Sequence, residues 1–250
     1  MISGFKNIAL KMGQKTLDFI LPPLCLQCHT LVLQQGGLCA SCWQKISFIS
    51  KPFCKSCGFP FDLHHELESI CGPCARKKPP FTRARAAIYY NEISKPLILR
   101  FKHGDALHMT PLFTEWLYQA GQDLFEQAEY IAPIPLHWSR LVYRGYNQAA
   151  ILSRKLSKKT KITHAPDLLK RKKRTPSQGT LTAKERDKNV SNAFKLNKKY
   201  DQLVRDKHIL LIDDVLTSGA TVQACAKVLK KSGAKQVDIL TLARVIKSEI

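Results

Sequence analysis

One short segment constrains the fold of this chain more than any other: an apolar run that leads directly into two carboxylates. The run spans residues 209–212, where four consecutive apolar side chains suit a strand buried on both faces of a parallel sheet. Asp213 and Asp214 follow it, and open parallel sheets bind ligands at the carboxyl ends of their strands. The segment therefore predicts an α/β fold, a parallel sheet flanked by helices, with a ligand site at this edge.

The loop after the acid pair predicts a phosphate site. Its side chains are all too small to hold an anion away from the backbone amides: Thr217, Ser218, Gly219, Ala220 and Thr221. Apolar residues recur at helical spacing from Val222 to Leu229, with Gly233 beyond them, so the loop should open a helix whose first amides bind the phosphate. Acceptors for hydroxyl groups beside donors for one phosphate fit a phosphorylated pentose.

Other interpretations of this segment fit less well. It contains neither the Lys-Ser/Thr pair of a Walker loop nor a Gly-x-Gly-x-x-Gly fingerprint. A surface turn with two solvated acids stays open, as does an acid pair that holds Mg²⁺ at a strand end, as in receiver or NTPase sheets. The order of strand, acids, loop and helix favours the phosphorylated sugar over both.

Eight of the nine cysteines lie in one short segment, as four Cys-x-x-Cys pairs. Two such pairs complete the tetrahedral shell of one Zn²⁺, and the few large apolar residues nearby make too small a core without a staple. Interleaved pairing, or metal at only one set, stays open. We expect two structural zinc ions with adjacent pairs sharing a metal, one held by Cys25, Cys28, Cys39 and Cys42 and one by Cys54, Cys57, Cys71 and Cys74.

The thiols are expected to be reduced, because the amino end does not resemble a signal peptide. Charged residues interrupt its apolar positions, among them Lys6, Lys11 and Asp18, and no small-residue cleavage site follows. No uncharged apolar run reaches the roughly 18 residues that a membrane span needs. We therefore expect a cytoplasmic protein, with an amphipathic amino-terminal helix that packs on the cysteine-rich part.

A charged, proline-rich stretch from Arg76 to Pro80 reads as a linker. It divides the chain into residues 1–80, with the amino-terminal helix and a double zinc ribbon, and residues 81–250, with the parallel sheet. In the second part we expect strands and helices in this order: a strand at 84–90, helices at 93–101 and 106–122, a short strand and loop at 130–137, a helix at 147–159, the strand at 209–212 with its helix, and a last strand at 237–245.

Cations before the helix at 147–159 predict a second anion site. Arg140, Arg144 and Gly145 are expected in a loop, where two arginines beside a glycine grip an anion. The alternative is that Asn147 caps the helix and the arginines are solvated. Farther along, residues 154–207 hold 18 of the 40 lysines and arginines. The net charge of +21 favours phosphate-rich partners, although the basic run at 170–174 is expected to be a solvated face.

Several of these segments together resemble the ComF family, which is associated with DNA uptake in competent bacteria. The matching text is Lys-His-Gly-Asp at 102–105, Pro-Ile-Pro-Leu-His at 133–137, Arg-Gly-Tyr-Asn-Gln at 144–148, and the stretches 178–190 and 213–221. One departure is Ser218, where the family commonly has Thr. The resemblance implies a type I phosphoribosyltransferase-like domain, in which residues 174–190 correspond to a mobile hood over the site.

The resemblance also implies roles for the site residues in binding phosphoribosyl pyrophosphate (PRPP) with Mg²⁺. Asp213 and Asp214 would bind the ribose hydroxyls and orient the ring. Residues 217–221 would bind the 5′-phosphate. The pyrophosphate would be bound by Arg140, Arg144 and Gly145, and Arg144 would assist its departure.

The function expected from this resemblance is PRPP binding and a role in DNA uptake and natural transformation with single-stranded DNA. One alternative is an active phosphoribosyltransferase on a base or amine acceptor, but no motif fixes an acceptor. Another is a zinc-module scaffold that docks a further competence protein, such as a helicase or recombination factor. Trp43, Trp116 and Trp138 offer rings for stacking on bases, with core packing as the expected use of most.

Overall fold

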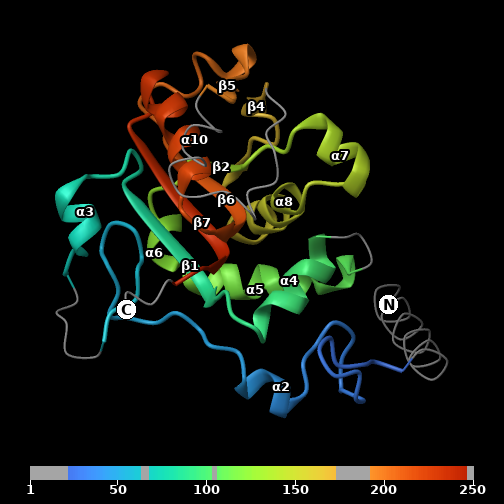
Figure 1. The fold of residues 1–250 in the computed structure, drawn as a ribbon. Coiled ribbons are helices and arrows are strands. Elements are labelled where there is room, and N and C mark those ends of the chain that lie inside the picture. Colours follow the sequence, from blue (N-terminus) through green and yellow to red (C-terminus); the bar gives the residue numbers. More distant parts are fainter. Residues whose placement is uncertain (1–21, 63–67, 103–105, 173–191, 247–250) are drawn as a thin grey trace, which may run out of the picture.

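A five-stranded parallel sheet forms the centre of the computed structural model (Figure 1), which describes residues 22–62, 68–102, 106–172 and 192–246. The order across the sheet is β1-β7-β6-β2-β3, and every neighbouring pair in it is parallel. The predicted α/β fold is confirmed. The strands are β1 (Arg83–Tyr89), β2 (Tyr130–Pro133), β3 (Thr163–His164), β6 (His208–Leu216) and β7 (Gln236–Arg244).

The central strands are apolar because helices cover the sheet on both faces. Helix α10 (Ala220–Lys231) packs on one face, and its Val222, Cys225 and Leu229 belong to the core there. Helices α4 (Ser94–Lys102), α5 (Thr110–Ala120) and α8 (Gln148–Thr160) contribute to the core of the other face. Residues 209–212 are therefore buried as a continuous run, as a strand enclosed on both sides requires.

Smaller elements complete the fold. β4 and β5 form a separate antiparallel pair beside α10, and α7 follows β2. The smaller elements are α2 (Ala40–Gln44), α3 (Gly72–Arg76), α6 (Gln122–Phe125), α7 (Trp138–Arg144), β4 (Leu169–Arg171), β5 (Phe194–Leu196), and the 3₁₀ turns η1 (Leu107–Met109) and η3 (Lys198–Tyr200).

The cysteine-rich module, which we define as residues 25–74, lies along the outer strand of the sheet. Backbone amides join it to β1 at three places: Ile49 N–H donates to Ala87 O (2.9 Å), Ala84 N–H to Ser56 O (2.7 Å) and Tyr89 N–H to Ser47 O (2.9 Å). These bonds occupy an edge that would otherwise be free to pair with another chain. Leu26 and Ile46 of the module lie in the same hydrophobic cluster as Ile88 of β1, so the two parts share a core. The predicted domain boundary near residue 80 therefore stays a prediction.

Most of the expected elements are present, and two differ. The helix expected at 106–122 is divided into η1, α5 and α6. The cationic segment expected as a loop is instead the helix α7, so that expectation was wrong. The expected amino-terminal helix, the hood at 174–190 and residues 103–105 fall wholly or almost wholly outside the described residues.

The close approach of the module to β1 predicts a severe effect of one small substitution. Gly58 has φ +68°, and a Cβ there would lie 2.3 Å from Ala84 O. Gly58→Ala should lower the free energy of unfolding by about 3 kcal/mol, from a left-handed penalty of about 1 kcal/mol plus a forced shift of β1 or the module. Gly145→Ala is the matched control in a urea titration, since Gly145 has φ +75° and open space around it. Equal losses in the two variants would contradict close packing at Gly58.

Candidate ligand cleft and metal clusters

A cleft of about 860 Å³ opens at the carboxyl end of β6. Its walls come from β6 and the loop after it, from α4, α7 and α8, and from β4. The residues that line it are Tyr90, Leu99, Lys102, Ile134, Pro135, Leu136, Arg140, Arg144, Asn147, Gln148, Ala149, Arg171, Asp213, Asp214, Val215, Leu216, Thr217, Ser218, Gly219, Thr221, Val222 and Val245. The cleft thus brings together segments more than 100 residues apart in the sequence.

The two predicted carboxylates lie on this cleft and are partly buried. Asp213 Oδ1 accepts a hydrogen bond from Asp214 N–H (2.9 Å). Lys102 Nζ lies 3.1 Å from Asp214 Oδ2, and the two side chains are only 19% and 16% exposed, so solvent screens this ion pair little. Burial and the neighbouring Asp214 carboxylate raise the pKa of Asp213 to about 7, against the opposing effects of Lys102 and Arg171.

The loop between β6 and α10 has the form of an anion site. Gly219 caps α10 at φ +77°, a conformation that glycine adopts without strain. Thr217, Ser218, Gly219 and Thr221 line the cleft at the amino end of this 12-residue helix, where free amides favour negative charge. Ala220 differs from the others: its side chain is buried in the core, and its N–H donates to Ser218 Oγ (3.4 Å).

Two arginines reach the cleft from α7. His137 caps this helix by accepting a hydrogen bond from Ser139 N–H (3.3 Å), and Gly145 ends it in a left-handed conformation. Asn147 then caps α8 by accepting from Ala149 N–H (3.1 Å), as the alternative interpretation had it. Arg140 and Arg144 nevertheless line the cleft, whereas Gly145 does not.

Two further cations of the cleft were given no binding role in the sequence analysis, although Lys102 belongs to a segment that carries the family resemblance. Lys102 ends α4, where its carbonyl accepts from Gln148 Nε2 (2.7 Å), and it meets Asp214. Arg171 lies over the Phe194 ring at 5.2 Å to the centroid, on the β4–β5 pair. Burial and the nearby Arg140 lower the pKa of Arg171. Arg171 was expected on a solvated face, and no local signal in the basic run marks it as a cleft residue.

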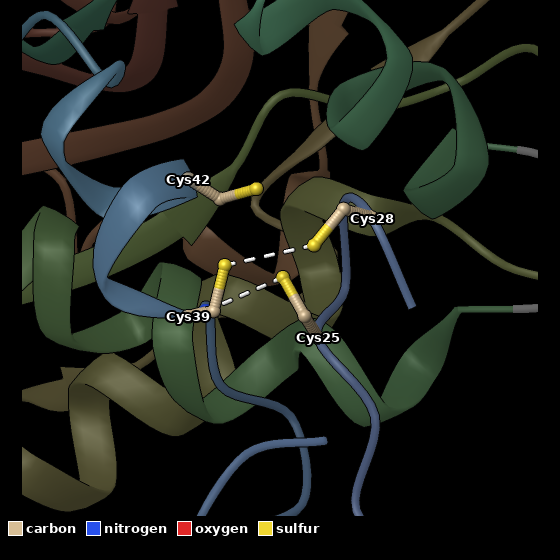
Figure 2. A group of neighbouring side chains, drawn as sticks. All are labelled: Cys25, Cys28, Cys39 and Cys42. Atoms are coloured by element: carbon tan, nitrogen blue, oxygen red, sulfur yellow. Dashed lines mark hydrogen bonds between the residues drawn. The ribbon is translucent and has the colours of Figure 1, made fainter. Parts of the chain in front are cut away.

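The eight cysteines of the module form two separate clusters of four. In each, the sulfur atoms all lie within 4.8 Å of one another, and Figure 2 shows Cys25, Cys28, Cys39 and Cys42 converging in the first. The second consists of Cys54, Cys57, Cys71 and Cys74. Adjacent pairing is thereby confirmed and interleaved pairing is wrong.

The spacing of the sulfur atoms fits zinc. Tetrahedral bonds of about 2.3 Å place sulfur atoms about 3.8 Å apart, and the Cys28–Cys39 and Cys57–Cys71 sulfur distances are both 3.6 Å. Backbone N–H groups also donate to one sulfur in each cluster, to Cys25 and to Cys54. Four thiolates leave no open position, so such a metal holds structure and does not act on a substrate.

Comparison with known proteins places both parts of the chain. The double zinc ribbon domain family matches residues 16–80, and the phosphoribosyl transferase domain family matches residues 142–250. Competence protein F of Haemophilus influenzae is 32% identical over 226 residues, which are 88% of this chain and 96% of that protein. DNA utilization protein YhgH of Escherichia coli is 30% identical over 231 residues, 90% of this chain and 98% of that protein.

Among solved structures, the allosteric regulatory enzyme of purine biosynthesis is similar at a TM-score of 0.39 and 12% identity, over 58% of this chain and 30% of that one.

No described helix combines the length and the apolar character that crossing a membrane requires.

The raised pKa of Asp213 predicts that this carboxyl destabilises the ligand-free fold at high pH. Between about pH 4 and pH 7 the folded state keeps a proton that the unfolded state has released, so the contribution of Asp213 to the free energy of unfolding falls as pH rises through this window. Asp213→Asn should therefore raise the free energy of unfolding by about 2 kcal/mol at pH 8, after a discount for partial exposure, and by much less at pH 5. Denaturant titrations of both proteins at the two pH values test this, and a gain that is equal at both contradicts it.

Proposed function

We propose, since the chain belongs to the ComF family of proteins with a double zinc ribbon and a phosphoribosyltransferase domain, that it binds PRPP with Mg²⁺ and acts in DNA uptake and transformation. One observation carries the first part: a single cleft holds an acid pair, a hydroxyl-rich loop at a helix start, and four cations. The names of the relatives, Competence protein F and DNA utilization protein, support the second part.

The charges of the cleft match the charges of PRPP. Lys102, Arg140, Arg144 and Arg171 outnumber the two carboxylates, so the lining is cationic overall and favours a ligand that carries several negative charges. The 5′-phosphate takes the loop from Thr217 to Thr221, through its amides and hydroxyls. The pyrophosphate binds to the arginines of α7, and the ribose hydroxyls donate hydrogen bonds to the acid pair.

Lys102 links the empty and the occupied cleft in this proposal. In the ligand-free protein it neutralises Asp214 at 3.1 Å. When ribose hydroxyls occupy Asp214, the lysine is free to turn its charge toward a phosphate group. Buried ion pairs carry a desolvation cost that their attraction only partly offsets, so exchanging one partner for a ligand group requires little net free energy.

The residues favour stabilisation of a departing pyrophosphate over covalent catalysis. If the bond between C1 of ribose and the pyrophosphate oxygen breaks, its electron pair leaves with pyrophosphate, and positive charge develops on the ribose. Arg140 and Arg144 are the groups placed for the leaving oxygen, and Asp213 and Asp214 orient the ring. Mg²⁺ bound with pyrophosphate supplies further neutralisation. The residues of the cleft do not identify the second substrate that would accept the phosphoribosyl group, and so they do not decide whether the protein turns PRPP over.

Single-stranded DNA is proposed to lie on the outer side of α7. Trp138 is 69% exposed, Val142 76% and Tyr143 83%, so this short helix presents two rings to solvent. The expectation of core packing holds for Trp116, which is 3% exposed, but was wrong for Trp138. His137 packs against Trp138, with ring centroids 5.5 Å apart, and so restrains it. Exposed rings beside arginines suit bases and phosphates together.

PRPP binding is tested by calorimetry with Mg²⁺. The wild type should bind, and Asp214→Asn should weaken the affinity about tenfold or more, because charge-assisted hydrogen bonds to the ribose hydroxyls are lost. Asp201→Asn is the matched control, since Asp201 is exposed and does not line the cleft. Absence of a heat of binding with the wild type would contradict PRPP binding in the cleft.

DNA binding is tested by fluorescence anisotropy with a labelled oligonucleotide of thymidines at about 50 and 200 mM salt. Affinity should fall steeply with salt, and Trp138→Ala with Tyr143→Ala should weaken it roughly tenfold, because stacking contributes about 1–3 kcal/mol per base. Leu33→Ala is the control, as Leu33 is an apolar residue on the module that is even more exposed than the two rings. Salt-independent binding, or equal affinity of the ring variant and the control, counts against this surface.

A further inference from the structure

The second cysteine cluster contacts the sheet through one arginine, Arg244, the last residue of β7. Its Nη1 donates to the backbone carbonyl of Cys57, and its Nη2 lies 3.7 Å from the Cys57 sulfur. Its guanidinium also lies over the Phe59 ring, at 5.5 Å to the centroid. A long side chain from the sheet thus ends on a metal-ligating residue.

The charge of Arg244 has no carboxylate partner among the described residues, where its Nε is also buried without a hydrogen bond. Four thiolates with Zn²⁺ carry a net charge of −2. The negative group beside Arg244 is therefore the metal complex itself, and groups that contact metal ligands from outside tune metal affinity. The first cluster is built differently: Cys28 and Cys39 contact the hydroxyls of Thr30 and Ser41.

The backbone of Arg244 lies directly behind the wall of the ligand cleft, next to residues that line it. Its carbonyl accepts from Tyr90 N–H (2.7 Å), and the next residue, Val245, donates its N–H to Leu216 O (2.9 Å). Tyr90, Val245 and Leu216 all line the cleft. One residue therefore touches the cysteine cluster with its side chain and holds the lining residue Tyr90 with its carbonyl, while the residue after it, Val245, bonds Leu216.

We propose that Arg244 is a positioning residue that couples zinc at the second cluster to the shape of the ligand cleft. With zinc bound, the four thiolates of the second cluster would carry a net negative charge beside Arg244, which would hold the guanidinium at Cys57. The held guanidinium would then fix the ends of β7 and β1. The coupling gives the zinc ribbon a function beyond its own folding, because loss of this metal loosens the wall against which the sugar phosphate binds. The identity of that ligand rests on the proposed function, but the coupling itself does not.

The metal side of the coupling is tested by zinc release to a chromogenic chelator. The wild type should yield two zinc ions per chain. Arg244→Met removes the charge and keeps the apolar stem, so one of the two ions should bind about 10–100-fold more weakly while the other is unchanged. Arg100→Met is the matched control: Arg100 Nη2 donates to Gln27 Oε1 (3.3 Å) beside the first cluster and contacts no thiol. It should leave both ions unchanged.

The cleft side is tested by amide hydrogen exchange of the same proteins. In Arg244→Met the Tyr90 and Val245 amides should exchange at least about tenfold faster, with no change in Arg100→Met. Because linkage is reciprocal for binding free energies, PRPP with Mg²⁺ should in turn raise the affinity of the wild type for one zinc ion. If PRPP has no such effect while the zinc and exchange results hold, the proposed ligand fails and the coupling stands.

Two results would overturn the coupling. One is release of both zinc ions from Arg244→Met at the rates of the wild type. The other is weaker zinc binding with unchanged exchange at Tyr90 and Val245, which would mean that Arg244 supports the metal alone. If Arg244→Met does not fold, Arg244→Lys tests the forked contact with Cys57, which it removes while it keeps the charge. Zinc affinity and exchange at Tyr90 and Val245 should then still change together, and a change in only one of them would overturn the coupling.

Discussion

The site depends on one electrostatic arrangement, a pair of adjacent carboxylates held at the end of a buried strand. β6 is enclosed on both faces, so Asp213 and Asp214 extend it into the cleft with little solvent to separate their charges. Lys102 offsets one of them, and the rise in the pKa of Asp213 reflects its burial first and the remaining repulsion from Asp214 second. Like charges also meet across the cleft, where burial and the nearby Arg140 together lower the pKa of Arg171. A ligand with hydroxyl donors and several phosphate charges would relieve both repulsions at once.

The parts of the site that the sequence predicts are those that local order decides. Strand, acids, loop and helix follow one another without interruption from 209 to 231, so their geometry depends on residues that are neighbours in the chain. The cysteine clusters are similar, because the short spacing within and between the pairs limits which thiols meet. Even here, burial of the Ala220 side chain follows from packing against the sheet, which no loop composition indicates.

The residues that sequence reasoning missed reach the cleft through long-range contacts. Lys102 meets Asp214 across 112 positions, and Arg171 is placed by the pairing of β4 with β5 and by Phe194. Arg171 looks like an ordinary surface cation in its own segment, and Lys102 is marked only by the family resemblance of residues 102–105. The sequence predicts a loop where the structure has α7, and no residue of this helix is buried, so no apolar face marks it. The helix is instead stabilised at its ends, by the His137 cap at its start and by left-handed Gly145 at its end.

The placement of α7 also bears on how one protein of this family would handle both a sugar phosphate and DNA. The same seven-residue helix carries Arg140 and Arg144 on the cleft and Trp138 and Tyr143 in solvent. Phosphates of a strand stacked on the rings would lie near the arginines that the proposed pyrophosphate site uses. Two polyanions that draw on the same cations oppose each other's binding, and the effect is mutual because linkage is reciprocal. In that arrangement, filling the cleft with the proposed sugar phosphate would weaken the binding of the strand, because both ligands need Arg140 and Arg144.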